Sequence, residues 1–204
     1  MKLHFINQES PTLLYALAEI REEDGVNLMH SEDDYPEIAS FAPKRKLEFL
    51  ATRALMKQCC AALNLPFEGI QKDEFGKPFL INLSAHISIS HSYPLVACMI
   101  NTASSCGIDI EAPRSQLLKI RKKFLNNEEL TYCGDDLKRL CIHWASKEAL
   151  YKIYGRKRLV FSDHLKVKIL SSQSIAGAIN FEQFEESYEL KYESHQNYIL
   201  VHSL

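Results

Sequence analysis

The chain has 204 residues, with 24 lysines and arginines against 26 aspartates and glutamates and a formal net charge of −2 at pH 7. Charged residues make up 25% of it and hydrophobic residues 46%, which are ordinary globular values and exclude wholesale disorder. The near-neutral balance disfavours a dedicated nucleic-acid or membrane-surface binder, so any basic site must be a local patch.

Targeting signals and metal-binding cysteine patterns are absent from the sequence. The start, MKLHFINQES, has no apolar stretch of signal-peptide length, and the longest apolar run, Leu95 to Ile100, is far too short to span a bilayer. The six cysteines form no C-x-x-C pair, and no histidines accompany them at zinc spacing. We therefore expect a cytoplasmic protein with reduced thiols and no membrane segment.

The first predicted elements are a helix and a hairpin. Apolar residues recur at helical spacing from Pro43 to about Leu63, and Pro66 ends this helix. Residues 72–78 read as a turn that carries Gly76-Lys77-Pro78. Residues 86–90 then alternate polar and apolar side chains, residues 91–94 turn, and residues 95–100 return as a more buried strand.

The second part of the chain repeats this order of helix and strands. A strand at 106–111 is followed by a charged, helical segment at 119–130 and by a long helix at 137–154, with Gly155 where a C-cap would lie. Strands follow at 165–170, 176–181 and 188–201, the last with a turn near 194–197. We predict an α+β fold of two halves, residues 1–103 and 104–204.

The segment Gly107-Ile108-Asp109-Ile110-Glu111 carries two carboxylates on one face of a strand, since strand side chains alternate. The Cα atoms of Asp109 and Glu111 would lie about 6.6 Å apart, close enough for both carboxylates to reach one hard cation. Side by side they repel each other unless a positive charge lies between them. The alternative is a half-exposed edge strand with no ligand.

The long helix contributes a third carboxylate. Glu148 shares its helix face with Trp144 and Cys141, and Lys152 follows one turn later. A part-buried Glu148 needs a partner, and a divalent cation also held by Asp109 and Glu111 would supply one. Three carboxylates plus water suit Mg²⁺ and substrate phosphates. The alternative is a surface ion pair between Glu148 and Lys152.

Polar and basic residues of the first half could bind an anion. His91 lies at the end of a strand among serine hydroxyls, Ser90 included, although a lone histidine is most often structural. Arg53, Lys46 and Lys77 are basic residues on a helix face and in a Gly-Lys-Pro turn. Each alone would be solvated surface, but together they could bind phosphates.

Four segments, GKPF, ISISHS, GIDIE and WASKEALYK, resemble in this order and spacing the motifs of the 4′-phosphopantetheinyl transferases. They span residues 76–152. The length and two-half layout are similar to the monomeric, surfactin-synthetase-activating (Sfp-like) type rather than to the short type that trimerises. The resemblance implies two similar α/β halves, a pseudo-dimer, with the active site at their interface.

The resemblance also implies a reaction. Coenzyme A donates its 4′-phosphopantetheine arm to a serine of an acyl or peptidyl carrier protein, and adenosine 3′,5′-bisphosphate is released. Mg²⁺ on the pyrophosphate is required. The implied partners are coenzyme A and the carrier protein, with no nucleic acid and no membrane.

The resemblance assigns roles to individual residues. The implied metal ligands are Asp109, Glu111 and Glu148. Lys152 would contact the pyrophosphate and protonate the leaving group, and either Glu148 or Glu128 would take the proton of the serine. The implied coenzyme A contacts are Ser90 and His91 near the 3′-phosphate, Arg53 on the 3′-phosphate with Lys46 or Lys44 assisting, and Lys77 at the adenine end.

The basic and apolar stretch 119–125 suits an acidic carrier protein, although a solvated charged helix fits it equally well. Three other functions remain open. One is a different Mg²⁺-dependent phosphoryl transfer or nuclease reaction at the same carboxylates. The second is a non-catalytic module that binds coenzyme A or a carrier protein. The third is nucleic-acid binding through the stretch 119–123, which the charge balance disfavours.

Overall fold

The computed structural model describes residues 1–21, 23–24, 35 and 38–204, and it divides the chain into two compact units. Unit 1 comprises Met1–Gln71 and Pro78–Ser104, and unit 2 comprises Lys72–Lys77 and Ser105–Leu204. The segment Lys72–Lys77, which the sequence predicts as a turn, therefore lies in unit 2 although the chain on both sides of it lies in unit 1. We call this segment the 72–77 loop.

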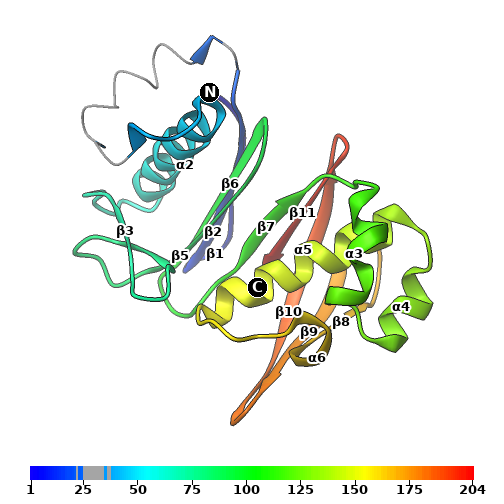
Figure 1. Cartoon of the computed structure of the whole chain (residues 1–204). Coiled ribbons are helices and arrows are strands. Elements are labelled where there is room, and N and C mark those ends of the chain that lie inside the picture. The colour runs from blue at the N-terminus through cyan, green and yellow to red at the C-terminus, as the bar shows by residue number, and fades with distance from the viewer. Residues whose placement is uncertain (22, 25–34, 36–37) are drawn as a thin grey trace. The chain divides into compact units, whose positions relative to one another are not determined.

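Unit 1 is a six-stranded sheet with one long helix on it (Figure 1). The sheet order is β1-β2-β6-β5-β4-β3. The strands are β1 (Lys2–Ser10), β2 (Leu13–Glu19), β3 (Ile70–Lys72), β4 (Pro78–Leu80), β5 (His86–Ser92) and β6 (Leu95–Asn101). Helix α2 (Pro43–Ala62) begins with a proline at its first position, where the missing N–H costs nothing. It buries Ala51, Leu55 and Cys59 against β2, β5 and β6.

Unit 2 contains a five-stranded antiparallel sheet in the order β7-β11-β10-β9-β8. The strands are β7 (Ile108–Glu111), β8 (Leu165–Ile169), β9 (Ser174–Phe181), β10 (Phe184–His195) and β11 (Tyr198–Ser203). The helices are α3 (Gln116–Phe124), α4 (Asn127–Cys133), α5 (Leu137–Tyr154) and the short α6 (Phe161–His164). The units are partly similar in connectivity: in each, a strand (β2 or β7) precedes the long helix, four strands follow that helix, and the last of the four pairs with the preceding strand. Unit 1 has the additional strand β1, and unit 2 has the additional helices α3, α4 and α6.

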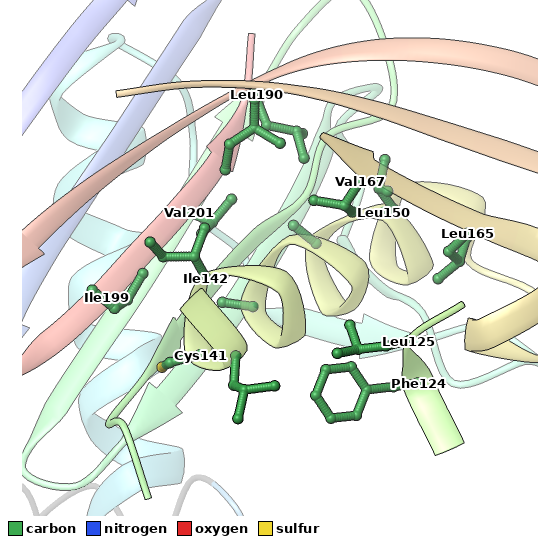
Figure 2. Packing of buried hydrophobic residues seen from close by; sticks show 14 of the residues in the cluster. Phe124, Leu125, Cys141, Ile142, Leu150, Leu165, Val167, Leu190, Ile199 and Val201 are labelled. Carbon is green, nitrogen blue, oxygen red and sulfur yellow. The ribbon is translucent and has the colours of Figure 1, made fainter. Parts of the chain in front are cut away.

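Helix α5 is central to the core of unit 2. Asp136 caps its start by accepting hydrogen bonds from the backbone N–H groups of Lys138 and Arg139, and Gly155 ends it in the left-handed region with φ of 66°. Figure 2 shows Ile142 and Leu150 of α5 among Val201 and Leu190 of the sheet. Phe124, the last residue of α3, and Leu125 belong to the same cluster. The fold therefore holds α5 firmly against β7 and β11.

The structure confirms the α+β class and most of the predicted elements. The helices over 43–62 and 137–154, with the glycine C-cap of the second, are as expected. The single helix expected over 119–130 is wrong: the chain forms α3 and α4, because Leu125 is extended and Asn126 starts a new helix through a capping box with Glu129. The hairpin β1–β2 was not expected, since the polar β1 shows no clear alternation.

None of the helices in the described part of the chain is long and apolar enough to cross a membrane.

Candidate active site

Two carboxylates on β7 face the long helix α5. Asp109 is only 4% exposed, and its Oδ1 accepts a hydrogen bond from Lys152 Nζ at 2.7 Å. Glu111 Oε1 accepts one from Trp144 Nε1 at 3.0 Å, and its Oε2 accepts one from the guanidinium of Arg114 at 2.9 Å. The sequence alternation on β7 thus brings both carboxylates to side chains of α5.

Glu148 belongs to the same electrostatic group. Burial, and next the charge of Asp109, raises the pKa of Glu148 to about 7, while Lys152 opposes that shift. Burial and the charge of Asp109 also raise the pKa of Glu111. The negative charge of Asp109 therefore makes both Glu111 and Glu148 harder to ionise, as expected of neighbouring carboxylates.

The glycine of the GIDIE motif allows β7 to approach α5 closely. A Cβ atom at Gly107 would lie 2.1 Å from the carbonyl oxygen of Ala149 and 2.9 Å from Ile153 Cγ1. At the same place Lys152 of α5 donates through Nζ to the carbonyl of Ile108 in β7 at 2.8 Å. A side chain at position 107 would push the carboxylates of β7 away from Glu148 and Lys152. Sequence reasoning gave this glycine no role.

A buried ion pair lies next to Glu148 along α5. Lys147, with no exposed surface, donates through Nζ to Glu129 Oε2 at 2.6 Å, to the carbonyl of Phe124 at 2.7 Å and to that of Phe161 at 3.0 Å. Glu129 Oε1 accepts a hydrogen bond from the backbone N–H of Val167 at 2.9 Å. These contacts connect α3, α4, α6 and β8 to α5.

Glu128 and Glu129 occupy very different environments. Glu128 is exposed on α4, outside the group formed by Asp109, Glu111 and Glu148. Glu129 is buried, but its carboxylate is committed to Lys147, to Val167 and to the backbone N–H of Asn126. Of the two bases considered from the sequence, Glu148 is the one whose charge interacts with the β7 carboxylates.

Lys77 lies in unit 2 at the end of α5. Its Nζ donates to the carbonyl of Ile153 at 2.9 Å, and its side chain lies over Gly155. Burial lowers the pKa of Lys77. The ammonium expected at the adenine end of coenzyme A thus contacts the last turn of the helix that carries Glu148 and Lys152.

In unit 1 the ring of His91 lies beside side chains of α2. Its Nδ1 is 3.3 Å from Glu48 Oε2, and its Nε2 is within hydrogen-bonding distance of the guanidinium of Arg45. Arg45 is itself 3.7 Å from Glu48. Neither Arg45 nor Glu48 was singled out from the sequence, although their spacing on a helix face beside the basic residues was visible.

The other predicted residues of unit 1 are spread over α2 and β5. The Arg53 guanidinium carbon lies 3.1 Å from the centroid of the Phe49 ring, and its Nη1 donates to the Phe49 carbonyl at 3.4 Å. Lys46 is partly exposed near the start of α2, and Ser90 is buried on β5. Arg53, Lys46, Ser90 and His91 thus belong to unit 1, and Asp109, Glu111, Glu148 and Lys152 belong to unit 2.

The carboxylates of unit 2 suit a hard cation by their chemistry. All are oxygen donors, and their mutual repulsion is what a bound cation would relieve. The two carboxylate oxygens of Glu111 accept hydrogen bonds from Trp144 and Arg114. Within the described ranges, no three His, Cys, Asp or Glu side chains already converge as a metal site.

Comparison with known families gives one match. The model of the 4′-phosphopantetheinyl transferase superfamily matches residues 105–201, which is just under half of the chain and nearly all of unit 2. A search of curated proteins gave no significant match. The match includes Asp109, Glu111, Glu148 and Lys152, so the part of the chain that carries the acidic group is similar to this superfamily of transferases.

Proposed function

We propose that the protein transfers the 4′-phosphopantetheine arm of coenzyme A to a serine of an acyl or peptidyl carrier protein. One observation carries the proposal: Lys152 of α5 donates to Asp109 of β7, and the charge of Asp109 acts on both Glu111 and Glu148, inside the segment that resembles the phosphopantetheinyl transferases. Such a group suits the transfer of a phosphoryl-linked arm, which depends on positioning and on neutralising charge.

In the proposed reaction the serine Oγ attacks the phosphorus that carries pantetheine. The bond from that phosphorus to the bridging oxygen breaks, and adenosine 3′,5′-bisphosphate leaves. Mg²⁺ held by Asp109, Glu111 and Glu148 would neutralise the pyrophosphate oxygens. Glu148 takes the serine proton, and Lys152, which α5 holds against Asp109, donates a proton to the leaving oxygen.

We propose that unit 1 supplies the contacts to coenzyme A. His91 and Ser90 would receive the 3′-phosphate and neighbouring atoms, with Arg53 and Lys46 adding positive charge. Arg45, which pairs with Glu48 beside His91, is a further cation at that place.

The carrier protein is proposed to dock at α3. The last turn of this helix carries Arg121, Lys122 and Lys123, while Phe124 is buried beneath it. An acidic partner would meet the exposed lysines by charge complementarity. We also propose an Sfp-like monomer in the cytoplasm, where the six free cysteines would stay reduced.

The test compares Asp109→Ala with Glu128→Ala in a transfer assay that uses coenzyme A and an apo carrier protein. We expect Asp109→Ala to lose transfer with its circular dichroism spectrum unchanged, because one metal ligand and the partner of Lys152 are removed together. Glu128→Ala should keep most of its activity, because Glu128 is exposed on α4. Full activity in folded Asp109→Ala would exclude the proposed site.

A further inference from the structure

The 72–77 loop is built around one carboxylate. Asp73 Oδ1 accepts hydrogen bonds from the backbone N–H groups of Phe75 at 2.9 Å and Lys77 at 2.8 Å. The N–H of Asp73 donates to the carbonyl of Lys77 at 3.0 Å, and Gly76 closes the turn with φ of 91°. These bonds fix where the Lys77 side chain leaves the loop.

From this fixed base, Lys77 reaches the end of α5. The last carbonyls of a helix have no partner within the helix, and a cation there is favourable because the helix dipole is negative at that end. Lys77 Nζ meets this need by donating a hydrogen bond to the carbonyl of Ile153 at 2.9 Å. Gly155 leaves room for the lysine: a Cβ at that position would lie 2.4 Å from Lys77 Cδ.

The turn that Lys77 caps is the turn that carries Lys152. Gly155 N–H donates to the carbonyl of Tyr151 at 2.9 Å, so the residues from Tyr151 to Gly155 form the final turn. Lys152 extends from this turn to Asp109 Oδ1 at 2.7 Å and to the carbonyl of Ile108 at 2.8 Å. If the turn frays, Lys152 loses the geometry of both contacts.

We propose that Lys77 is a positioning residue, which caps the last turn of α5 and so holds Lys152 against Asp109. The kinetic part of this inference rests on the proposed transfer reaction, whereas the capping itself does not. The role differs from a direct contact with coenzyme A. A ligand contact would act on binding, but a capping contact acts on the protein before any substrate is present.

The test uses Lys77→Met, which keeps the apolar stem and removes the donor. Lys77→Arg restores a cationic donor, and Lys72→Met, an exposed lysine at the edge of the same loop, is the matched control. In the substrate-free protein we expect hydrogen exchange of the amides at 153–155 to quicken by about tenfold in Lys77→Met and to stay near wild type in both other variants. In the transfer assay, kcat should fall roughly 10- to 100-fold while the KM for coenzyme A stays within about twofold.

The outcomes separate the inference from the function. If hydrogen exchange of the amides at 153–155 is unchanged in Lys77→Met, the inference is overturned. If the KM for coenzyme A is also raised in that variant, Lys77 is assigned to substrate binding instead. A wild-type protein that transfers nothing overturns the proposed function, while the exchange data still decide the capping. Should Lys77→Met not fold, Asp73→Ala, which removes the acceptor that shapes the loop, should quicken the same amides, and its failure to do so overturns the inference.

Discussion

Trp144 is the only tryptophan of the chain, and its indole N–H holds one oxygen of Glu111. The indole ring packs edge-on against Phe124, with ring centroids 5.2 Å apart, and lies 5.8 Å from the ring of Phe161. This packing fixes the ring, and the ring in turn orients the carboxylate. If Glu111 is a metal ligand, as proposed, loss of a group that orients it is expected to lower metal affinity about 10- to 100-fold.

We expect Trp144→Phe to raise the Mg²⁺ concentration needed for half-maximal transfer by about tenfold, because Glu111 loses its indole donor while an aromatic ring remains. A Mg²⁺ titration of the transfer rate measures this. Phe161→Leu is the control, since it loosens the packing around the indole but leaves the N–H in place. It should lower the melting temperature without shifting the titration. An unshifted titration in Trp144→Phe would contradict a ligand role for Glu111.

The raised pKa of Glu148 predicts a pH-dependent stability of the metal-free protein. Its pKa is about 7 in the folded chain against 4.5 for an ordinary glutamate, so the folded state binds the proton more tightly. The contribution of the Glu148 carboxyl to folding stability is therefore fully present below about pH 4.5 and is lost as the pH rises through about 7. In EDTA, we expect Glu148→Gln to melt at a higher temperature than wild type at about pH 8, and this gap to close toward about pH 4.5. A difference in melting temperature between Glu148→Gln and wild type that does not change with pH would contradict the raised pKa of Glu148.

Strand β7 passes so close to α5 at position 107 that only a glycine fits there. We expect Gly107→Ala to prevent folding of unit 2 or to destabilise it by several kcal/mol, about 3 or more, because the new Cβ would overlap a backbone carbonyl of α5. Thermal unfolding measures the loss. Gly134→Ala is the control, since nothing lies within 4 Å of a Cβ there and only the positive φ of 51° opposes it. Equal melting temperatures for the two variants would show that the approach is not as close as described.

At the scale of elements, the Lys147–Glu129 pair fastens four segments to the middle of α5. Both side chains are buried. Lys147 donates to the carbonyls of the last residue of α3 and the first residue of α6, and Glu129 accepts from the N–H groups of the N-cap residue of α4 and of Val167 in β8. Burial lowers the pKa of Lys147. A buried pair of this kind is costly to break from one side, because the remaining charge has no partner.

Lys147→Met should therefore cost about 3–5 kcal/mol of unfolding free energy, since the Glu129 carboxylate would be left buried. The double variant Lys147→Met with Glu129→Gln removes that charge and should be more stable than Lys147→Met alone. Urea denaturation of wild type, both single variants and the double variant completes the cycle. Additive losses would mean that the two side chains do not depend on each other.

The sequence predicts elements well where their signals are local. Helix α5 has an apolar stripe and a glycine C-cap, and both are as expected. The break between α3 and α4 depends on two bonds between Asn126 and Glu129, a short signal inside a continuous run of charged residues. Strand β1 is an edge strand with many polar residues, so its pairing with β2 rests on the register of the sheet and not on its own pattern.

The same division applies to the candidate site. Asp109, Glu111, Glu148 and Lys152 were identified from two motifs, because strand and helix periodicity place them on defined faces. What holds these residues could not be read from either motif. The indole donor to Glu111, the close approach at Gly107 and the cap at Ile153 join segments far apart in the chain, and only the tertiary fold brings them together.

For the whole molecule, the two units are partly similar in connectivity but carry different functional side chains. Unit 2 holds the acidic group and the match to the transferase superfamily. Unit 1 holds the histidine, serine and arginine proposed to bind coenzyme A. The proposed transferase would use both sets of residues, whereas a binding module would need no acidic group. The repulsion among the three carboxylates is costly without a cation, which favours the transferase.

The most direct test of this account is intact-mass spectrometry of an apo carrier protein mixed with this protein and coenzyme A, in Mg²⁺ and then in EDTA. Apo acyl and apo peptidyl carrier proteins are tried in parallel, because the acceptor class is open. We expect the carrier protein to gain the mass of one phosphopantetheine arm in Mg²⁺ and none in EDTA. No gain with any carrier protein, in a protein that still binds coenzyme A, would contradict the transferase and point to a binding module.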